Sequence, residues 1–155
     1  MYKKILVPLD GSELAECVLP HVESIVKGRG VEEVIFLRIV EPVRIPAGYY
    51  FPGLSPDAAK DIDAGNKAAA EEYLSNLVEH TDYKGVKVRS EIASGQPAES
   101  IAEYAEKNMV DLITLATHGR SGISRWAWGS VADRVMRSAC VPVLMVRAPG
   151  CVPGI

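Results

Sequence analysis

Five short apolar runs alternate with segments of helical periodicity along this chain. The runs cover residues 4–9, 32–40, 86–93, 110–116 and 141–147. Strands that alternate with helices are joined by right-handed crossovers, which give a parallel sheet with helices on both faces. The runs also lack strict in–out alternation, as expected for strands that are buried on both faces. The pattern therefore predicts an α/β fold with one open, parallel, five-stranded sheet.

Helical patterns fill the intervals between these runs. The first follows Ser12, a favourable N-cap residue, and its apolar positions recur at helical spacing: Leu14, Val18, Val22 and Ile25. Further helices are predicted over residues 57–81, 97–107 and 130–138, and the second of these opens on a proline, which suits a first helical position. No internal repeat is present, so a single domain is the simplest arrangement for 155 residues.

Composition excludes several classes of protein. A net charge of -3 argues against a nucleic-acid-binding module, although it does not bear on one small anionic ligand. No apolar run is long enough to span a bilayer, and the apolar run near the N-terminus is too short for a signal peptide, so a cytoplasmic protein is expected. The three cysteines are odd in number and have no CxxC spacing, which indicates neither a disulfide framework nor a zinc site.

A glycine-rich stretch follows the fourth run and leads into the last helix. It contains Gly119, Gly122 and Gly129, and Ser130 follows directly. In an open parallel sheet, ligands bind beyond the carboxyl ends of the strands. The first N–H groups of a helix lack partners within the helix, and glycines let a phosphate approach the backbone closely. The stretch therefore predicts an anion site, although Ser130 with Asp133 also resembles a capping box.

Arginine supplies almost all of the charge near this stretch. Residues 116–147 contain five arginines and one aspartate, which gives a local charge of +4. The planar guanidinium suits phosphate, and Arg120 and Arg125 lie inside the loop, where they could reach a ligand. The other three are expected on a solvated helix face or at the end of the sheet. Neither GxxxxGK[ST] nor GxGxxG after the first run is present, so this is neither a P-loop nor a dinucleotide fingerprint.

Other candidate residues have alternative interpretations. Asp10, which precedes Gly-Ser after the first run, is either a turn residue or a ligand contact. His118 lies in the glycine stretch, but no nucleophile with a paired acid accompanies it, so a loop role is favoured over catalysis. Trp126 and Trp128 are interpreted as core or interface anchors rather than base-stacking residues. Residues 41–57, with four prolines and three aromatics, form either a surface loop or a lid.

Three segments of the chain resemble the universal stress protein family, in that family's order. They are KKILVPLDGSELAE, ASGQPAESI and ATHGRSGISRWAWGSVADRVMRSACVPVLMVR. The family's nucleotide-binding branch has Gly, two residues, Gly, nine residues, and then Gly-Ser or Gly-Thr. Here Gly119, nine residues and Gly129-Ser130 match that pattern, while Ala116 replaces the first glycine. The resemblance extends over the whole chain, with a family domain at 1–147 and a tail at 148–155.

The resemblance implies a Rossmann-like sheet of order 3-2-1-4-5, similar to the adenine nucleotide alpha hydrolases, and a site for ATP or AMP. Asp10 would contact the adenosine portion, and the backbone of Ile39 would read the adenine edge. The implied nucleotide-binding residues are Pro8, Leu9, Asp10, Ile39, Gly95, Leu115, Ala116, His118, Gly119, Arg120, Gly122, Gly129, Ser130 and Val131. Mg²⁺ or Mn²⁺ would accompany the phosphates, with waters as most of its ligands.

The resemblance also implies a homodimer that pairs through strand five, residues 141–146. An apolar edge strand with no later element to cover it favours the same pairing. The function expected is nucleotide sensing or partner binding in a stress response, with no nucleic-acid or membrane partner. Two alternatives stay open, namely a slow ATP hydrolase or adenylyl-transfer enzyme, and a dimerisation module without nucleotide.

Overall fold

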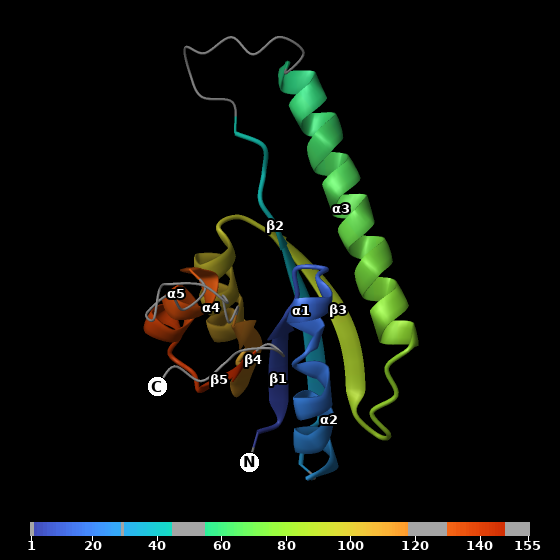
Figure 1. Ribbon diagram of the computed structural model, residues 1–155, viewed down its shortest axis with the longest axis vertical. Coiled ribbons are helices and arrows are strands. Elements are labelled where there is room, and N and C mark those ends of the chain that lie inside the picture. Colours follow the sequence, from blue (N-terminus) through green and yellow to red (C-terminus); the bar gives the residue numbers. More distant parts are fainter. Residues whose placement is uncertain (1, 29, 45–54, 118–129, 148–155) are drawn as a thin grey trace.

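The sheet has five parallel strands in the order β3-β2-β1-β4-β5 (Figure 1). The structure is a computed structural model that describes residues 2–28, 30–44, 55–117 and 130–147. The strands are β1 (Lys4–Pro8), β2 (Glu33–Val40), β3 (Lys87–Ser94), β4 (Leu112–Thr117) and β5 (Val143–Arg147). The bounds of each strand lie within two residues of those of the apolar run that predicted it. The predicted fold class and strand order are therefore confirmed.

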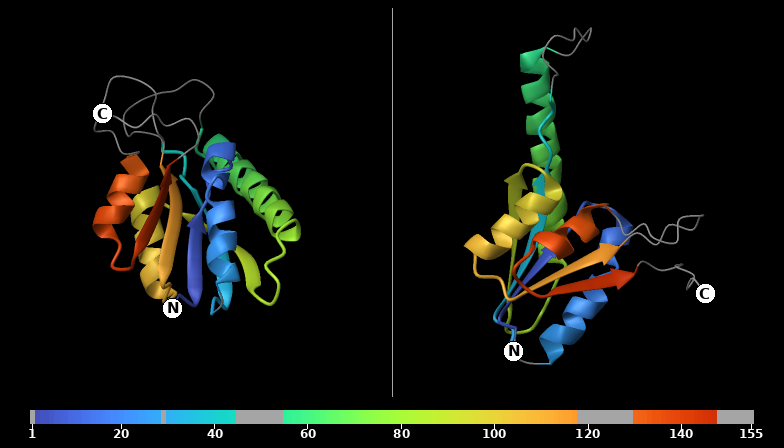
Figure 2. Two further views of the ribbon diagram at one scale, coloured as in Figure 1. Left: turned by 60° about the horizontal axis from the view of Figure 1, so that its bottom comes forward. Right: turned by 90° about the vertical axis from the view of Figure 1, so that its left-hand side faces the viewer.

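Helices cover both faces of this sheet (Figures 1 and 2). They are α1 (Glu13–Glu16), α2 (Leu19–Lys27), α3 (Pro56–Glu79), α4 (Pro97–Lys107) and α5 (Ser130–Ser138). The first three lie on one face, and α4 and α5 lie on the other. Within the described ranges, no helix combines the length and the apolar character that crossing a membrane requires.

The first predicted helix is divided into two. Ser12 caps α1 as expected, since its Oγ accepts a hydrogen bond from the Ala15 amide at 3.1 Å. The helix then ends at Glu16, and α2 begins at Leu19 with Pro20 in its first turn. Proline has no N–H to donate and its ring obstructs the preceding turn, so it fits the start of α2 but not the interior of one continuous helix.

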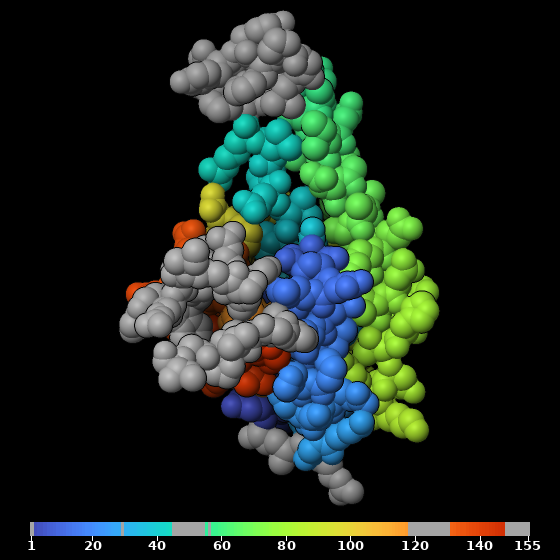
Figure 3. All heavy atoms as spheres, viewed as in Figure 1, coloured from blue at the N-terminus to red at the C-terminus, as the bar shows by residue number. Residues whose placement is uncertain are grey.

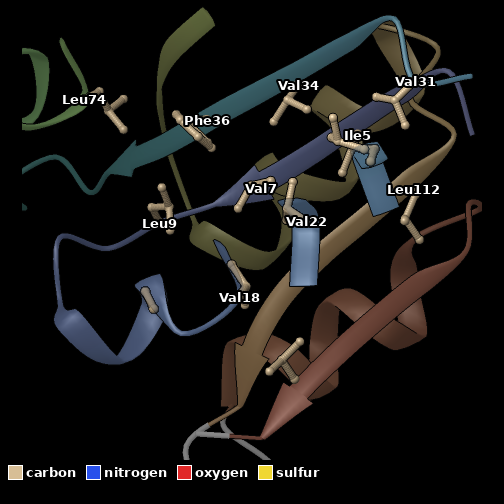
Figure 4. Close-up of a cluster of buried hydrophobic side chains, with 13 residues drawn as sticks. Ile5, Val7, Leu9, Val18, Val22, Val31, Val34, Phe36, Leu74 and Leu112 are labelled. Carbon is tan, nitrogen blue, oxygen red and sulfur yellow. The ribbon is translucent and has the colours of Figure 1, made fainter. Parts of the chain in front are cut away.

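Two apolar clusters, one on each face, hold the layers together. The first joins β1, β2 and β4 to α2 and α3, and Figure 4 shows its side chains converging between the sheet and α2. Its fully buried members include Ile5, Val7 and Phe36. The second cluster, with Leu6, Ile35 and Val135 among its members, packs α4 and α5 against the other face. Because β1 contributes alternate side chains to both clusters, it is the centre of the fold.

Thr114 is a polar residue in the middle of this apolar sheet. It is fully buried on β4, and its Oγ1 has no hydrogen-bond partner among the described residues. A buried hydroxyl without a partner costs about 1–3 kcal/mol, and valine has almost the same shape. We therefore expect Thr114→Val to raise the free energy of unfolding by about 1 kcal/mol, measured by urea denaturation. A lower stability would show that the hydroxyl is satisfied in solution.

Candidate functional site at the carboxyl edge of the sheet

The carboxyl ends of the strands lie at one edge of the sheet, as the parallel arrows in Figure 2 show. The Asp10 turn leaves this edge after β1, Gly95 follows β3, and Ala116 lies near the end of β4. Helices α1, α4 and α5 begin on the same side, because each follows a strand that ends there. The residues predicted for a nucleotide site, as far as the structure describes them, therefore lie at this one edge of the sheet.

Asp10 organises the turn between β1 and α1. Its Oδ1 accepts hydrogen bonds from the Ser12 amide at 2.9 Å and from the Ser12 hydroxyl at 2.5 Å. Gly11 between them has a φ of +79°, a conformation that favours glycine. The turn role that the sequence suggested for Asp10 is therefore present. Asp10 is also exposed, so its carboxylate remains within reach of a ligand.

The end of β2 lies beside this turn. Pro8 pairs with Leu37, and the Leu9 amide donates to the Leu37 carbonyl at 2.9 Å. Continuing the same register places Ile39 level with the Asp10 turn. The Ile39 side chain packs against the second apolar cluster and is partly buried. The backbone of Ile39 therefore lies beside the Asp10 turn.

Gly95 has a steric reason to be glycine. Its φ is +147°, and a Cβ at this position would lie 2.5 Å from the Ser100 Oγ, inside contact distance. Its amide donates to the Val40 carbonyl at 3.2 Å, which ties the β3–α4 connection to the end of β2. Packing alone therefore accounts for Gly95, and its predicted contact with a ligand stays a prediction.

The end of β4 is buried on both faces. Leu115, which is 4% exposed, belongs to the second cluster, whereas Ala116 packs against the first. Ala116 occupies the position at which the family pattern has its first glycine, and it pairs with Val146 of β5. Its methyl group thus contacts the apolar core on the side of α1–α3.

Helix α5 is fixed against α4 near the same edge. Ala132 and Val135 are buried in the second cluster, and Arg134 pairs with Glu99 in the first turn of α4. Val131 is 38% exposed at the start of α5, where its amide has no partner within the helix. Asp133, predicted to complete a capping box, pairs with Arg137 at 3.0 Å.

Part of the predicted site lies outside the described residues. This holds for His118, Gly119, Arg120, Gly122 and Gly129, and also for Arg125, Trp126, Trp128 and residues 45–54 of the predicted loop. The side chain of Ser130 is likewise not described. In the part of the chain that the structure does describe, no three potential metal-ligating side chains are grouped.

The structure adds a polar group of residues that the sequence analysis did not predict. The Tyr73 hydroxyl of α3 donates to Glu16 Oε1 of α1 at 2.8 Å, and Figure 3 shows the α1–α2 segment lying against α3. Burial, followed by this hydrogen bond, raises the pKa of Tyr73 well above its ordinary value. Arg38 of β2 lies beside Gly11, and its charge lowers the pKa of the same hydroxyl. The signal in the sequence was the single basic residue within the run EVIFLRIV.

Comparison with known proteins agrees with this architecture. The universal stress protein family model matches residues 1–147. Universal stress protein MJ0531 of Methanocaldococcus jannaschii is 35% identical over 96% of this chain and 84% of its own length. Universal stress protein MJ0577 of the same organism is 33% identical over 95% of this chain and 96% of its own.

Solved structures share the fold. That of MJ0577 superposes with a TM-score of 0.78 at 29% identity, and the match covers 97% of this chain and 99% of that one. A universal stress protein from Arabidopsis thaliana, solved with AMP bound, has a TM-score of 0.63 at 19% identity over 96% of this chain and 93% of that one. Another, solved in complex with cAMP, has a TM-score of 0.58 at 20% identity over 95% and 98%.

Proposed function

Because this chain belongs to the universal stress protein family, we propose that it binds ATP or AMP at the carboxyl edge of its sheet and acts as a nucleotide-sensing regulator. The observation that carries this proposal is the placement of the exposed Asp10 turn between the end of β2 and the end of β4. Two proteins of the same fold bind AMP and cAMP, which supports an adenine nucleotide as the ligand.

The proposed pose extends from β2 across β1 to α5. The base lies against the backbone of Ile39, and Asp10 accepts hydrogen bonds from the sugar. Leu115 and Ala116 form the floor below the ribose. The phosphates lie at the start of α5, where unpaired N–H groups and the helix dipole favour negative charge. The phosphate contacts come from Gly119, Arg120, Gly129, Ser130 and Val131. Residues 1–147 form the binding domain, and 148–155 form a tail.

Isothermal titration calorimetry of the full chain with ATP, AMP and GTP tests this proposal. We expect one adenine nucleotide per chain and much weaker binding of GTP, because guanine carries a carbonyl in place of the adenine amino group. Repeating the ATP titration with EDTA shows whether Mg²⁺ contributes. Absence of binding to both adenine nucleotides would contradict the proposal, and steady release of ADP or AMP from ATP would favour the enzyme alternative.

We further propose that the protein is a homodimer through β5. This strand is an edge of the described sheet, and Leu144 on it is 37% exposed.

Replacing Leu144 with lysine puts a charge into the proposed apolar contact, so Leu144→Lys should weaken the dimer at least about tenfold. The measurement is sedimentation velocity over a concentration series, with Ile62→Lys as control, since Ile62 is 44% exposed on α3. A monomeric wild type, or an unaffected Leu144→Lys dimer, would contradict this interface.

A further inference from the structure

Arg38 interrupts the apolar strand β2 close to the candidate site. Alternation along the strand places its side chain on the same face as Val34 and Phe36, the face covered by α1–α3. A Cβ built on Gly11 would lie 3.2 Å from Arg38 Nη1 and 3.8 Å from its Cζ. The guanidinium therefore packs directly beneath the turn that contains Asp10 and Gly11.

The Arg38 guanidinium has donors without acceptors. Its Nε and Nη1 are fully buried and have no hydrogen-bond partner among the described residues, although the side chain as a whole is only partly buried. Arginine cannot shed its charge by losing a proton, and unsatisfied buried donors destabilise a protein. An acceptor-bearing ligand that reaches the guanidinium at the Asp10 turn would satisfy these donors.

Arg38 and Asp10 both act electrostatically on the Tyr73 hydroxyl. Asp10 raises the pKa of Tyr73 while Arg38 lowers it, after the larger contributions of burial and of the Glu16 hydrogen bond. Both charged groups therefore lie close enough to the Tyr73 hydroxyl to act on it. This corner of the site thus presents a carboxylate, which accepts hydrogen bonds, and a guanidinium, which donates them.

We propose that Arg38 is a ribose-recognition residue, which donates to a hydroxyl oxygen of the sugar cis-diol while Asp10 accepts from the diol. The inference rests on the proposed function. Each hydroxyl of a diol both donates and accepts, so a guanidinium and a carboxylate side by side complement it. The phosphates lie elsewhere, because β2 and β4 flank β1 on opposite sides, roughly 10 Å apart at normal strand spacing.

The expected consequence is selectivity for ribonucleotides. A site that hydrogen-bonds a hydroxyl discriminates strongly against an analogue that lacks it, because the buried partner is left unsatisfied. We expect the wild-type chain to bind AMP about tenfold more tightly than 2′-deoxy-AMP or 3′-deoxy-AMP. Arg38→Met retains the apolar stem but removes the donors, so it should weaken AMP binding and reduce at least one of these ratios to less than about threefold.

Calorimetry of the full-length variants with AMP, both deoxy analogues and adenosine provides the test. Arg38→Lys, which keeps the charge and one donor group, should restore part of the selectivity. Arg89→Met is the matched control, because Arg89 on the neighbouring strand β3 donates to Glu33 Oε1 at 2.8 Å, away from the site. That variant should lose stability yet keep the ribose selectivity of the wild type.

The outcomes separate this inference from the proposed function. If the wild type binds AMP but does not prefer it over either deoxy analogue, or if both ratios survive in Arg38→Met, Arg38 does not recognise ribose. If Arg38→Met instead lowers the preference for AMP over adenosine, the guanidinium contacts phosphate, and the inference is also wrong. Failure of the wild type to bind any of the four ligands would overturn the proposed function itself.

Discussion

Gly129→Val should lower the affinity for ATP by at least about a hundredfold while the protein remains folded. In the proposed site, phosphate oxygens accept hydrogen bonds from backbone N–H groups at the start of α5. A valine side chain just before Ser130 would occupy the space that the phosphate needs, and it would displace several charge-assisted hydrogen bonds at once. Calorimetry with ATP measures the loss, and circular dichroism with thermal unfolding checks that the variant is folded.

Gly65 provides a matched control for this substitution. It lies in the exposed part of α3, and a Cβ built there has no neighbour within 4 Å. Glycine is about 1 kcal/mol less favourable than alanine inside a helix, and valine is also better than glycine. Gly65→Val should therefore bind ATP normally and unfold at an equal or higher temperature. An affinity for ATP that Gly129→Val leaves unchanged would refute the proposed phosphate site.

Asp10→Ala should reduce the affinity for AMP by about tenfold to a hundredfold. The substitution removes the carboxylate that the proposed pose assigns to the sugar, and it also removes the acceptor for the Ser12 amide and hydroxyl. Two effects are therefore combined in this variant. Adenosine should lose as much affinity as AMP, since the lost contact lies on the nucleoside rather than on the phosphate. Titrating both ligands measures this.

Ser12→Ala separates the two effects. It removes the hydroxyl that donates to Asp10 and caps α1, so it should lower the stability by about 1 kcal/mol, but it leaves the carboxylate in place. We expect its affinity for AMP to stay within about threefold of the wild type. If Ser12→Ala lost as much affinity as Asp10→Ala, Asp10 would act by ordering the turn and not by contacting the ligand.

The sequence predicted the sheet well because strands buried on both faces leave a strong local signal. Runs such as EVIFLRIV identify a central strand whatever the rest of the chain does, and Ser12 and Pro97 marked helix starts correctly. The break between α1 and α2 was missed, because the apolar positions continue in helical register through Pro20. There the ring and missing N–H of proline outweighed the periodicity.

The candidate site was predictable only in part, because folding assembles it from distant segments. Asp10 could be identified from its position after an apolar run. The contact between Glu16 and Tyr73, which are 57 positions apart, leaves no local pattern. Arg38 was visible as a charge in an apolar run, but its position beneath Gly11 depends on how β1 and β2 pair. Local periodicity predicts the elements, whereas long-range pairing determines which side chains meet.

The central position of β1 has a consequence for how this protein can respond to a ligand. Ile5, Leu6 and Val7 are 0% exposed, and the strand has a hydrogen-bonded neighbour on each side. Local opening there would disrupt both layers, so the amides of β1 should exchange with deuterium only through global unfolding. Asp10 is thus attached to the most rigid part of the chain. We therefore expect any structural adaptation to a ligand to occur in other parts of the proposed site and not at the end of β1.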